Sequence, residues 1–197
     1  MKKPSTNEEQ FINRHGTSSL STMLVCGPDL RFYYAKAKWP GSVADARVFR
    51  NSSLNRDLQS GRLNPTPNGF LLGDSGYPNL NYLLTPVLRT RTAKEERYNR
   101  AHKKTRRLIE CAIGVLKQRF RCLLDKLYLS PERAAQIILA CVTLHNICIK
   151  PVDVEQALNE NPLPMNVADA NLEQEMPTDN EDNNVQLNRR SQIIDLF

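Results

Sequence analysis

Two carboxylates occupy positions in the sequence where an acidic side chain could do chemistry. The first, Asp74, follows the short apolar run "GFLLG" and lies between Gly73 and Gly76. A strand over residues 69–73 would deliver Asp74 at its carboxyl end, where α/β sheets bind their ligands. A turn aspartate that accepts backbone N–H groups is the plainer interpretation, and the spacing alone favours it.

The second carboxylate, Glu110, is the one acid within a basic stripe of a predicted helix. Helical periodicity runs from Ala93 to about Leu127, and it places Glu110 on one face with Gly114 and with Lys103, Arg106, Arg107, Lys117 and Arg121. An ion pair with a neighbouring arginine would explain the acid. It would not explain Gly114, because a helical glycine costs about 1 kcal/mol relative to alanine. A bare helical turn beside a carboxylate leaves room for a large ligand.

Charge is distributed unevenly along the 197 residues, although the net charge is only +6. Residues 89–133 hold 14 Lys and Arg against 5 Asp and Glu, whereas residues 151–197 hold 10 acids against 2 bases. A solvated helix face is the ordinary interpretation of such a basic run. The size of the excess nevertheless favours contact with a nucleic-acid backbone, through Lys103, Lys104, Arg106, Arg107, Lys117, Arg119 and Arg121.

Carboxylate oxygens are the ligands that hard divalent cations prefer, and a metal pair can activate water for phosphodiester cleavage. Two acids are normally too few for that chemistry, so a third is expected. A zinc enzyme is disfavoured because the histidines are not spaced as metal ligands. A serine hydrolase and a P-loop protein are disfavoured because no G-x-S-x-G or Gly-rich phosphate loop is present. The five cysteines form no CxxC pair and indicate reduced thiols rather than a zinc site. No membrane span or signal peptide is expected.

The elements that must position these acids can be read from periodicity and turn residues. We predict a β-hairpin over residues 18–26 and 31–39 and a helix N-capped by Ser42 over residues 42–51. A buried strand is predicted over residues 69–73, an edge strand over 81–87, and two long helices over 93–127 and 131–148. Ser130 caps the last helix, with Pro131 at its first position. Beyond Lys150 the composition predicts an acidic, disordered tail, in which "SQIIDLF" could dock as a short motif.

With these features in place, the chain resembles the DDE superfamily endonuclease domain of the PIF/Harbinger transposases and of nucleases derived from them. The matching stretches are "FINRHG", "WPGSVADARVFRNSSL", "LLGDSGYP", "LLTP", "RYNRAHKKTRRLIECAIGVLKQRFRCL" and "ACVTLHNIC". They occur in the same order over residues 11–150. The predicted division is therefore an N-terminal remnant at 1–10, the endonuclease domain at 11–150 and the tail at 151–197.

The resemblance implies an α/β, RNase H-like fold, a mixed sheet flanked by helices, in which three acids bind Mg²⁺ or Mn²⁺ and cleave DNA. The family's second acid falls on Asp74 and its glutamate on Glu110. The first aspartate precedes the segment that matches residues 2–16, so we expect the chain to be N-terminally truncated, with the first central strand missing. Neither Asp29 nor Asp45 is a convincing substitute. The family often has histidine where Ala44 stands.

Three hypotheses follow. The first is a metal-dependent DNA endonuclease, a hydrolase of phosphodiester bonds, that is impaired because one catalytic acid is absent. The second is a non-catalytic DNA-binding or partner-binding module, and the third is a fragment that does not fold stably. The resemblance also implies a separate DNA-binding partner protein. A DNA substrate would place the protein in the nucleus, with the cytoplasm as a second location.

Overall fold

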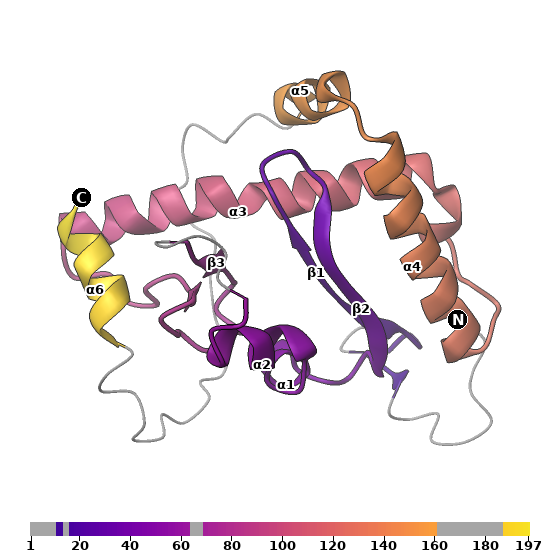
Figure 1. Ribbon diagram of the computed structural model, residues 1–197, viewed down its shortest axis with the longest axis horizontal. Helices are drawn as coiled ribbons and strands as arrows, with labels where there is room; N and C mark the ends of the chain where they lie inside the picture. Colours follow the sequence, from indigo (N-terminus) through magenta and orange to yellow (C-terminus); the bar gives the residue numbers. More distant parts are fainter. Residues whose placement is uncertain (1–10, 14–15, 64–68, 161–186) are drawn as a thin grey trace. The chain divides into compact units, whose positions relative to one another are not determined.

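The computed structural model describes residues 11–13, 16–63, 69–160 and 187–197 (Figure 1). The chain divides into two compact units. Unit 1 comprises Met1–Leu63 and Arg106–Glu160, and unit 2 comprises Asn64–Thr105 and Asn161–Phe197. The longest helix, α3 (Ala93–Arg119), contributes its first part to unit 2 and its last part to unit 1. The predicted remnant at residues 1–10 lies outside the described residues.

The predicted hairpin is confirmed in unit 1. Strands β1 (Leu20–Cys26) and β2 (Phe32–Pro40) pair antiparallel. At the end of the connecting turn Leu30 has a φ of 58°, a left-handed conformation that costs a branched residue about 1–2 kcal/mol. The Leu30 side chain is fully buried, and this burial offsets the backbone strain.

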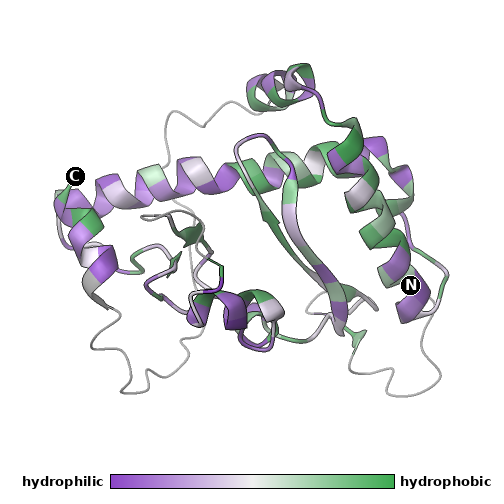
Figure 2. Ribbon diagram, viewed as in Figure 1, coloured by the Kyte–Doolittle hydropathy of each residue, from purple (hydrophilic) through white to green (hydrophobic). Residues whose placement is uncertain are grey.

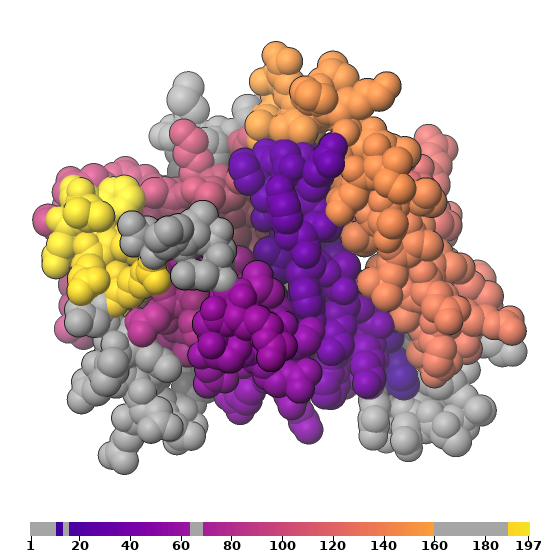
Figure 3. Space-filling model, in the orientation of Figure 1, coloured from indigo at the N-terminus to yellow at the C-terminus, as the bar shows by residue number. Residues whose placement is uncertain are grey.

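Helix α4 (Pro131–Cys148) holds the start of β2 with two adjacent side chains. The Asn146 amide accepts the Phe32 N–H at 2.8 Å and donates to the Phe32 carbonyl at 2.7 Å, as a neighbouring strand would. His145 Nε2 donates to the Leu30 carbonyl at 2.9 Å. The space-filling view shows α4 lying alongside the hairpin (Figure 3). These bonds satisfy backbone groups that would otherwise be costly to bury.

The helices after the hairpin differ from the prediction. Helix α1 (Asp45–Arg50) starts after Ala44, so the expected N-cap at Ser42 is wrong. A second helix, α2 (Ser53–Gln59), was not predicted. Its N-cap is Ser52, whose buried hydroxyl accepts the Asn55 N–H at 3.0 Å. Ser52 in "NSSL" therefore begins a new helix at the point where the prediction had only the end of the preceding helix.

Helix α3 ends at Arg119, earlier than the predicted residue 127. Phe120 leaves the helical conformation, with φ −115° and ψ 81°, and a 3₁₀ turn, η2 (Arg121–Leu123), follows. Helix α4 begins as predicted, because the Ser130 hydroxyl accepts the Arg133 N–H and Pro131 occupies the first turn. The apolar periodicity continues beyond the true end of α3, and of the apolar residues that follow, Phe120 and Leu123 are partly buried against the core of unit 1.

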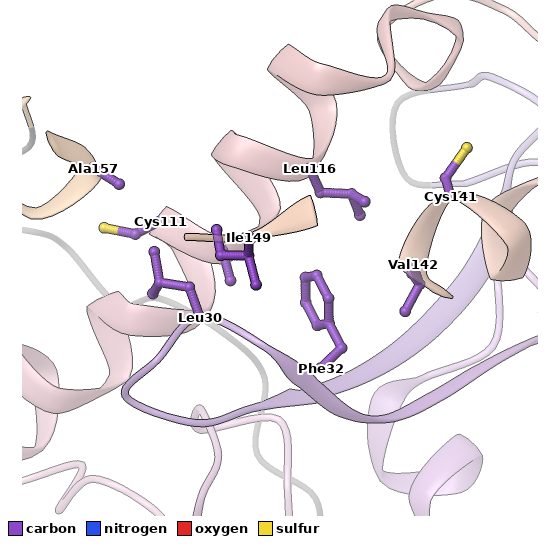
Figure 4. Packing of buried hydrophobic residues seen from close by; sticks show 9 residues of the cluster. Leu30, Phe32, Cys111, Leu116, Cys141, Val142, Ile149 and Ala157 are labelled. Atoms are coloured by element: carbon purple, nitrogen blue, oxygen red, sulfur yellow. The ribbon is translucent and has the colours of Figure 1, made fainter. Parts of the chain in front are cut away.

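The core of unit 1 joins the hairpin to α3, α4 and α5 (Pro151–Glu160). In Figure 4 the side chains of Leu30 and Phe32 lie among Leu116 of α3 and Ile149 after α4, and Ala157 of α5 closes one end. The expectation of disorder immediately after Lys150 is therefore wrong. Within residues 151–160, Ala157 is buried and Val154 and Leu158 are partly buried on the same helix face, whereas Val152 is exposed.

Unit 2 contains two short strands and the last helix of the sequence. Strand β3 (Leu71–Leu72) pairs parallel with β4 (Leu83–Leu84), and helix α6 (Leu187–Asp195) lies where disorder was also expected. The strand predicted to be buried on both faces, β3, is half-buried, whereas the predicted edge strand, β4, is buried. Side chains of α3 again hold backbone: Asn99 makes two bonds of 2.8 Å to Val87, and His102 Nε2 donates to the Leu84 carbonyl.

The protein is α/β, with helices and small sheets, as the sequence indicates. Within the described ranges the strands make two separate two-stranded sheets, so the single mixed sheet implied by the resemblance is not formed among them. Helix α4 is hydrophobic over most of its length (Figure 2). No single helix in the described part of the chain is long and apolar enough to cross a membrane, although α4 and α5 meet that criterion as a pair bent by 105°.

The His145 ring predicts an acid-sensitive stability. The ring is fully buried, and burial lowers its pKa below the ordinary 6.5, helped by Arg119 and opposed by the bond to Leu30 and by Asp153. The unfolded chain therefore binds the proton first. The contribution of His145 to stability is complete above pH 6.5 and is lost as the pH falls toward its lower folded pKa.

We expect the free energy of unfolding, measured in urea, to fall more between pH 7.5 and 5.5 in the parent chain than in His145→Gln. The slope difference has an upper limit of about 1.4 kcal/mol per pH unit. Glutamine keeps a donor for Leu30 but does not titrate. Identical slopes for the two chains would contradict the prediction.

Candidate functional site

Asp74 is positioned by a tight turn directly after β3. Its Oδ1 accepts the Gly76 N–H at 2.9 Å, and its carbonyl accepts the Tyr77 N–H at 3.2 Å. A side chain at Gly73 would press on Tyr77, at 3.1 Å from the nearest atoms, and one at Gly76 would lie 3.1 Å from the Asp74 carboxylate. The two glycines thus allow the turn to close around the acid.

The plainer interpretation of Asp74 is therefore correct as far as one oxygen is concerned. An asparagine would make the same Oδ1 bond, so the turn alone does not require an acid. Within the described part of unit 2, Oδ2 has no hydrogen-bond partner, and the side chain is half-buried. A carboxylate held by one oxygen and open at the other is suited to bind a cation.

Glu110 is an exposed acid on α3 with an ion pair one turn away. Arg106 Nη2 donates to Glu110 Oε1 at 2.7 Å, and the Glu110 side chain is 60% exposed. The ordinary salt-bridge interpretation is thus confirmed for Arg106. Gly114 remains open: a Cβ built there meets nothing within 4 Å among the described residues, so no packing contact calls for a glycine.

The two acids belong to different units, Asp74 to unit 2 and Glu110 to unit 1. Among the described residues no group of three or more His, Cys, Asp or Glu gathers as a metal site. Asp29, which was not expected to replace the first acid, is engaged within the hairpin turn, where it accepts the Arg31 N–H and the Tyr33 O–H. The assignment of Asp74 and Glu110 as metal ligands stays a prediction.

The predicted DNA-binding cations fall into two groups. Arg107 donates to the Leu158 carbonyl at 3.0 Å and Arg119 to the Asp153 carboxylate at 3.0 Å, so both fasten α5 to α3. Each has a second, buried nitrogen, Nη1, without a partner in the described residues. Arg106 is engaged by Glu110. The others are exposed, namely Lys103, Lys104, Lys117 and Arg121.

Asp153 receives an N–H from Lys150 as well as the Arg119 guanidinium, and these two partners lower the pKa of its carboxyl. No local pattern pairs Arg119 with an acid 34 positions away. Also missed were the structural amides Asn99 and Asn146. A partial signal was available, since Asn146 directly follows the buried His145 and Asn99 stands three residues before the buried His102.

A comparison with protein families matches most of the length of this chain. Residues 1–146 match the family described as DDE superfamily endonuclease. The chain therefore belongs to that family. No solved structure matches the sequence.

Individual proteins from animals and a plant are also similar in sequence to this chain. The chain is 39% identical over 152 residues to the mouse protein named "Putative nuclease HARBI1" and 37% identical over 153 residues to the human one. It is 32% identical over 157 residues to the Arabidopsis "Protein ALP1-like". These alignments cover 76%, 76% and 74% of this chain but only 43%, 43% and 38% of the relatives, so the chain spans less than half of their length.

The split between engaged and exposed cations can be tested by stability. Arg119→Met should lower the free energy of unfolding by about 1–3 kcal/mol, because it leaves the Asp153 carboxylate without its guanidinium partner. Lys117→Met, an exposed position on the same helix, is the matched control and should change it by less than about 0.5 kcal/mol. Equal losses in urea denaturation would show that Arg119 has no special structural role.

Proposed function

We propose that this chain is the catalytic part of a divalent-metal-dependent DNA endonuclease of RNase H-like fold. In this proposal Asp74 and Glu110 are the family's second and third acids and hold Mg²⁺ or Mn²⁺. The observation that carries it is the Asp74 turn, which fixes one carboxylate oxygen at the end of β3 and leaves the other open. The family assignment supports the substrate class.

The metal would supply activation of water and stabilisation of the leaving oxygen in phosphodiester cleavage. The chain's own residues would hold the metal by carboxylate oxygens, the ligands that hard cations prefer. Glu110 must exchange Arg106 for the metal, so its ion pair competes with binding. With two of the family's three acids, the 197-residue polypeptide is expected to bind metal weakly and to cleave DNA poorly by itself.

Titration calorimetry with Mn²⁺ tests the assignment. We expect Asp74→Asn and Glu110→Gln each to weaken Mn²⁺ binding about tenfold or more, since losing a ligand should cost at least as much as losing an outer-shell partner. Glu96→Gln removes an exposed acid from the same helix as Glu110 and is the control, with unchanged affinity expected. Unchanged affinity in both site variants would remove the metal assignment.

A second candidate function is a non-catalytic module that binds DNA or a partner protein. It is favoured by the exposed cations of α3, which are free for phosphate contact whether or not a metal binds. Both candidate functions include binding to DNA, and we therefore propose that the protein acts in the nucleus. We also propose that a separate DNA-binding protein is its partner.

Salt-dependent DNA binding tests the α3 surface. The double variant Lys103→Gln/Lys117→Gln should weaken binding to duplex DNA and reduce the slope of log K against log salt by about 2, because two phosphates are no longer neutralised. Lys126→Gln/Arg133→Gln has the same change of charge at exposed positions off the stripe and should leave the slope nearly unchanged. Equal effects of the two pairs in fluorescence anisotropy would mean that the α3 stripe is not the binding surface.

A further inference from the structure

Helix α6 makes specific contacts with the part of unit 2 that carries Asp74. Arg189 Nη1 donates to the Asn81 carbonyl at 2.9 Å, and the guanidinium carbon of Arg189 lies 5.8 Å from the centre of the Phe70 ring. Both interactions come from one side chain. Arg189 therefore joins two residues that lie eleven positions apart and on either side of Asp74.

These two residues stand at the start of the β3–β4 ladder. Phe70 immediately precedes β3, and Asn81 lies two residues before β4. The ladder itself is short, with Leu71 opposite Leu83 and Leu72 opposite Leu84. A two-residue parallel ladder is weak alone, so a cation that stacks on one flank and hydrogen-bonds to the other adds to its closure.

Two further contacts anchor α6 at its other end. Phe197 packs edge-to-face on Tyr98, with ring centres 6.4 Å apart, and Lys94 Nζ donates to the Asp195 carbonyl at 2.8 Å. Tyr98 is buried and its hydroxyl donates to the Thr85 carbonyl directly after β4. The anchor thus rests on a residue that is itself tied to the ladder. Figure 1 shows α6, in yellow, beside the start of α3.

We propose that α6 is a docking element that holds the Asp74 segment closed, with Arg189 as its positioning residue. Docked α6 keeps the β3–β4 ladder formed and so fixes the backbone that presents the open oxygen of Asp74. Undocked α6 leaves a two-residue ladder and a looser turn, with weaker Mn²⁺ binding. The part about metal rests on the proposed function, whereas the docking does not.

The segment that docks on Phe70, Asn81 and Tyr98 is residues 187–197 of this chain. The contacts of Arg189 and Phe197 define which side chains such a segment needs. The surface requires an arginine that can stack on Phe70 while donating to a carbonyl, and an aromatic ring about two helical turns later for Tyr98. Lysine would keep the charge at 189 but lacks the planar group that stacks. Leu196, next to Phe197, is 85% exposed and takes no part.

Amide hydrogen exchange in the full chain tests the docking. The reporters are the Leu71 and Gly73 amides, which donate to the Tyr82 and Leu84 carbonyls. Phe197→Ala and Arg189→Gln should each speed their exchange about tenfold, while the matched neighbour Leu196→Ala should not. Amides of β1 and β2 in unit 1 should be unchanged in all three. Unaltered exchange in Phe197→Ala and Arg189→Gln would overturn the proposal.

A synthetic peptide of residues 187–197, added in trans to the Phe197→Ala chain, separates positioning from simple coverage. The parent peptide should restore slow exchange at Leu71 and Gly73. The same peptide with Arg189→Gln should bind but fail to restore it. Restoration by both peptides would overturn the role of Arg189, and restoration by neither would overturn docking through this segment.

Mn²⁺ titration of the same variants links docking to the site. We expect Arg189→Gln and Phe197→Ala to weaken by several-fold the Mn²⁺ binding that depends on Asp74, although neither supplies a ligand, and Leu196→Ala to leave it unchanged. If the parent chain shows no binding that depends on Asp74, the proposed function fails while faster exchange still supports docking. If the parent chain does show such binding, and the variants exchange faster but bind Mn²⁺ with unchanged affinity, the positioning role of Arg189 is wrong.

Discussion

Unit 1 depends on hydrogen bonds from adjacent side chains of α4 to the backbone at the start of β2. His145 and Asn146 between them satisfy the Leu30 carbonyl and both backbone groups of Phe32. Because backbone groups cannot be buried unpaired, this arrangement lets a two-stranded hairpin be covered by a helix without a third strand at that point. Phe32 itself belongs to the buried apolar cluster of unit 1. Asn99 and His102 of α3 do the same for unit 2.

This construction explains how the chain uses its polar residues. Arginines that the charge pattern assigns to a ligand are partly structural, because Arg107 and Arg119 fasten α5 across the core. The exposed lysines of α3 are the ones left for a polyanion. In the Asp74 carboxylate one oxygen closes the turn, and the other is the one that the proposed function assigns to a metal.

Local signals in the sequence predicted much of this correctly. The hairpin, the Ser130 cap with Pro131, the turn at Asp74 and the Arg106–Glu110 pair all follow from spacing within a few residues. The errors arose where distant contacts decide. Helix α3 stops at Arg119 although apolar periodicity continues, and α5 is ordered by burial of Ala157 against elements far away in sequence. Polar composition alone had predicted disorder there.

The sequence by itself determined the family, the α/β class and the residues that could carry chemistry, because motifs, caps and periodicity are properties of short stretches. Only the tertiary structure decided which cations are engaged, which histidines hold backbone and that the last helix braces the segment bearing Asp74. Those outcomes depend on pairs such as Arg189 with Asn81 or Asn146 with Phe32, separated by more than a hundred positions. The free energy of such a pair depends on burial and geometry that folding creates, and no local pattern encodes it.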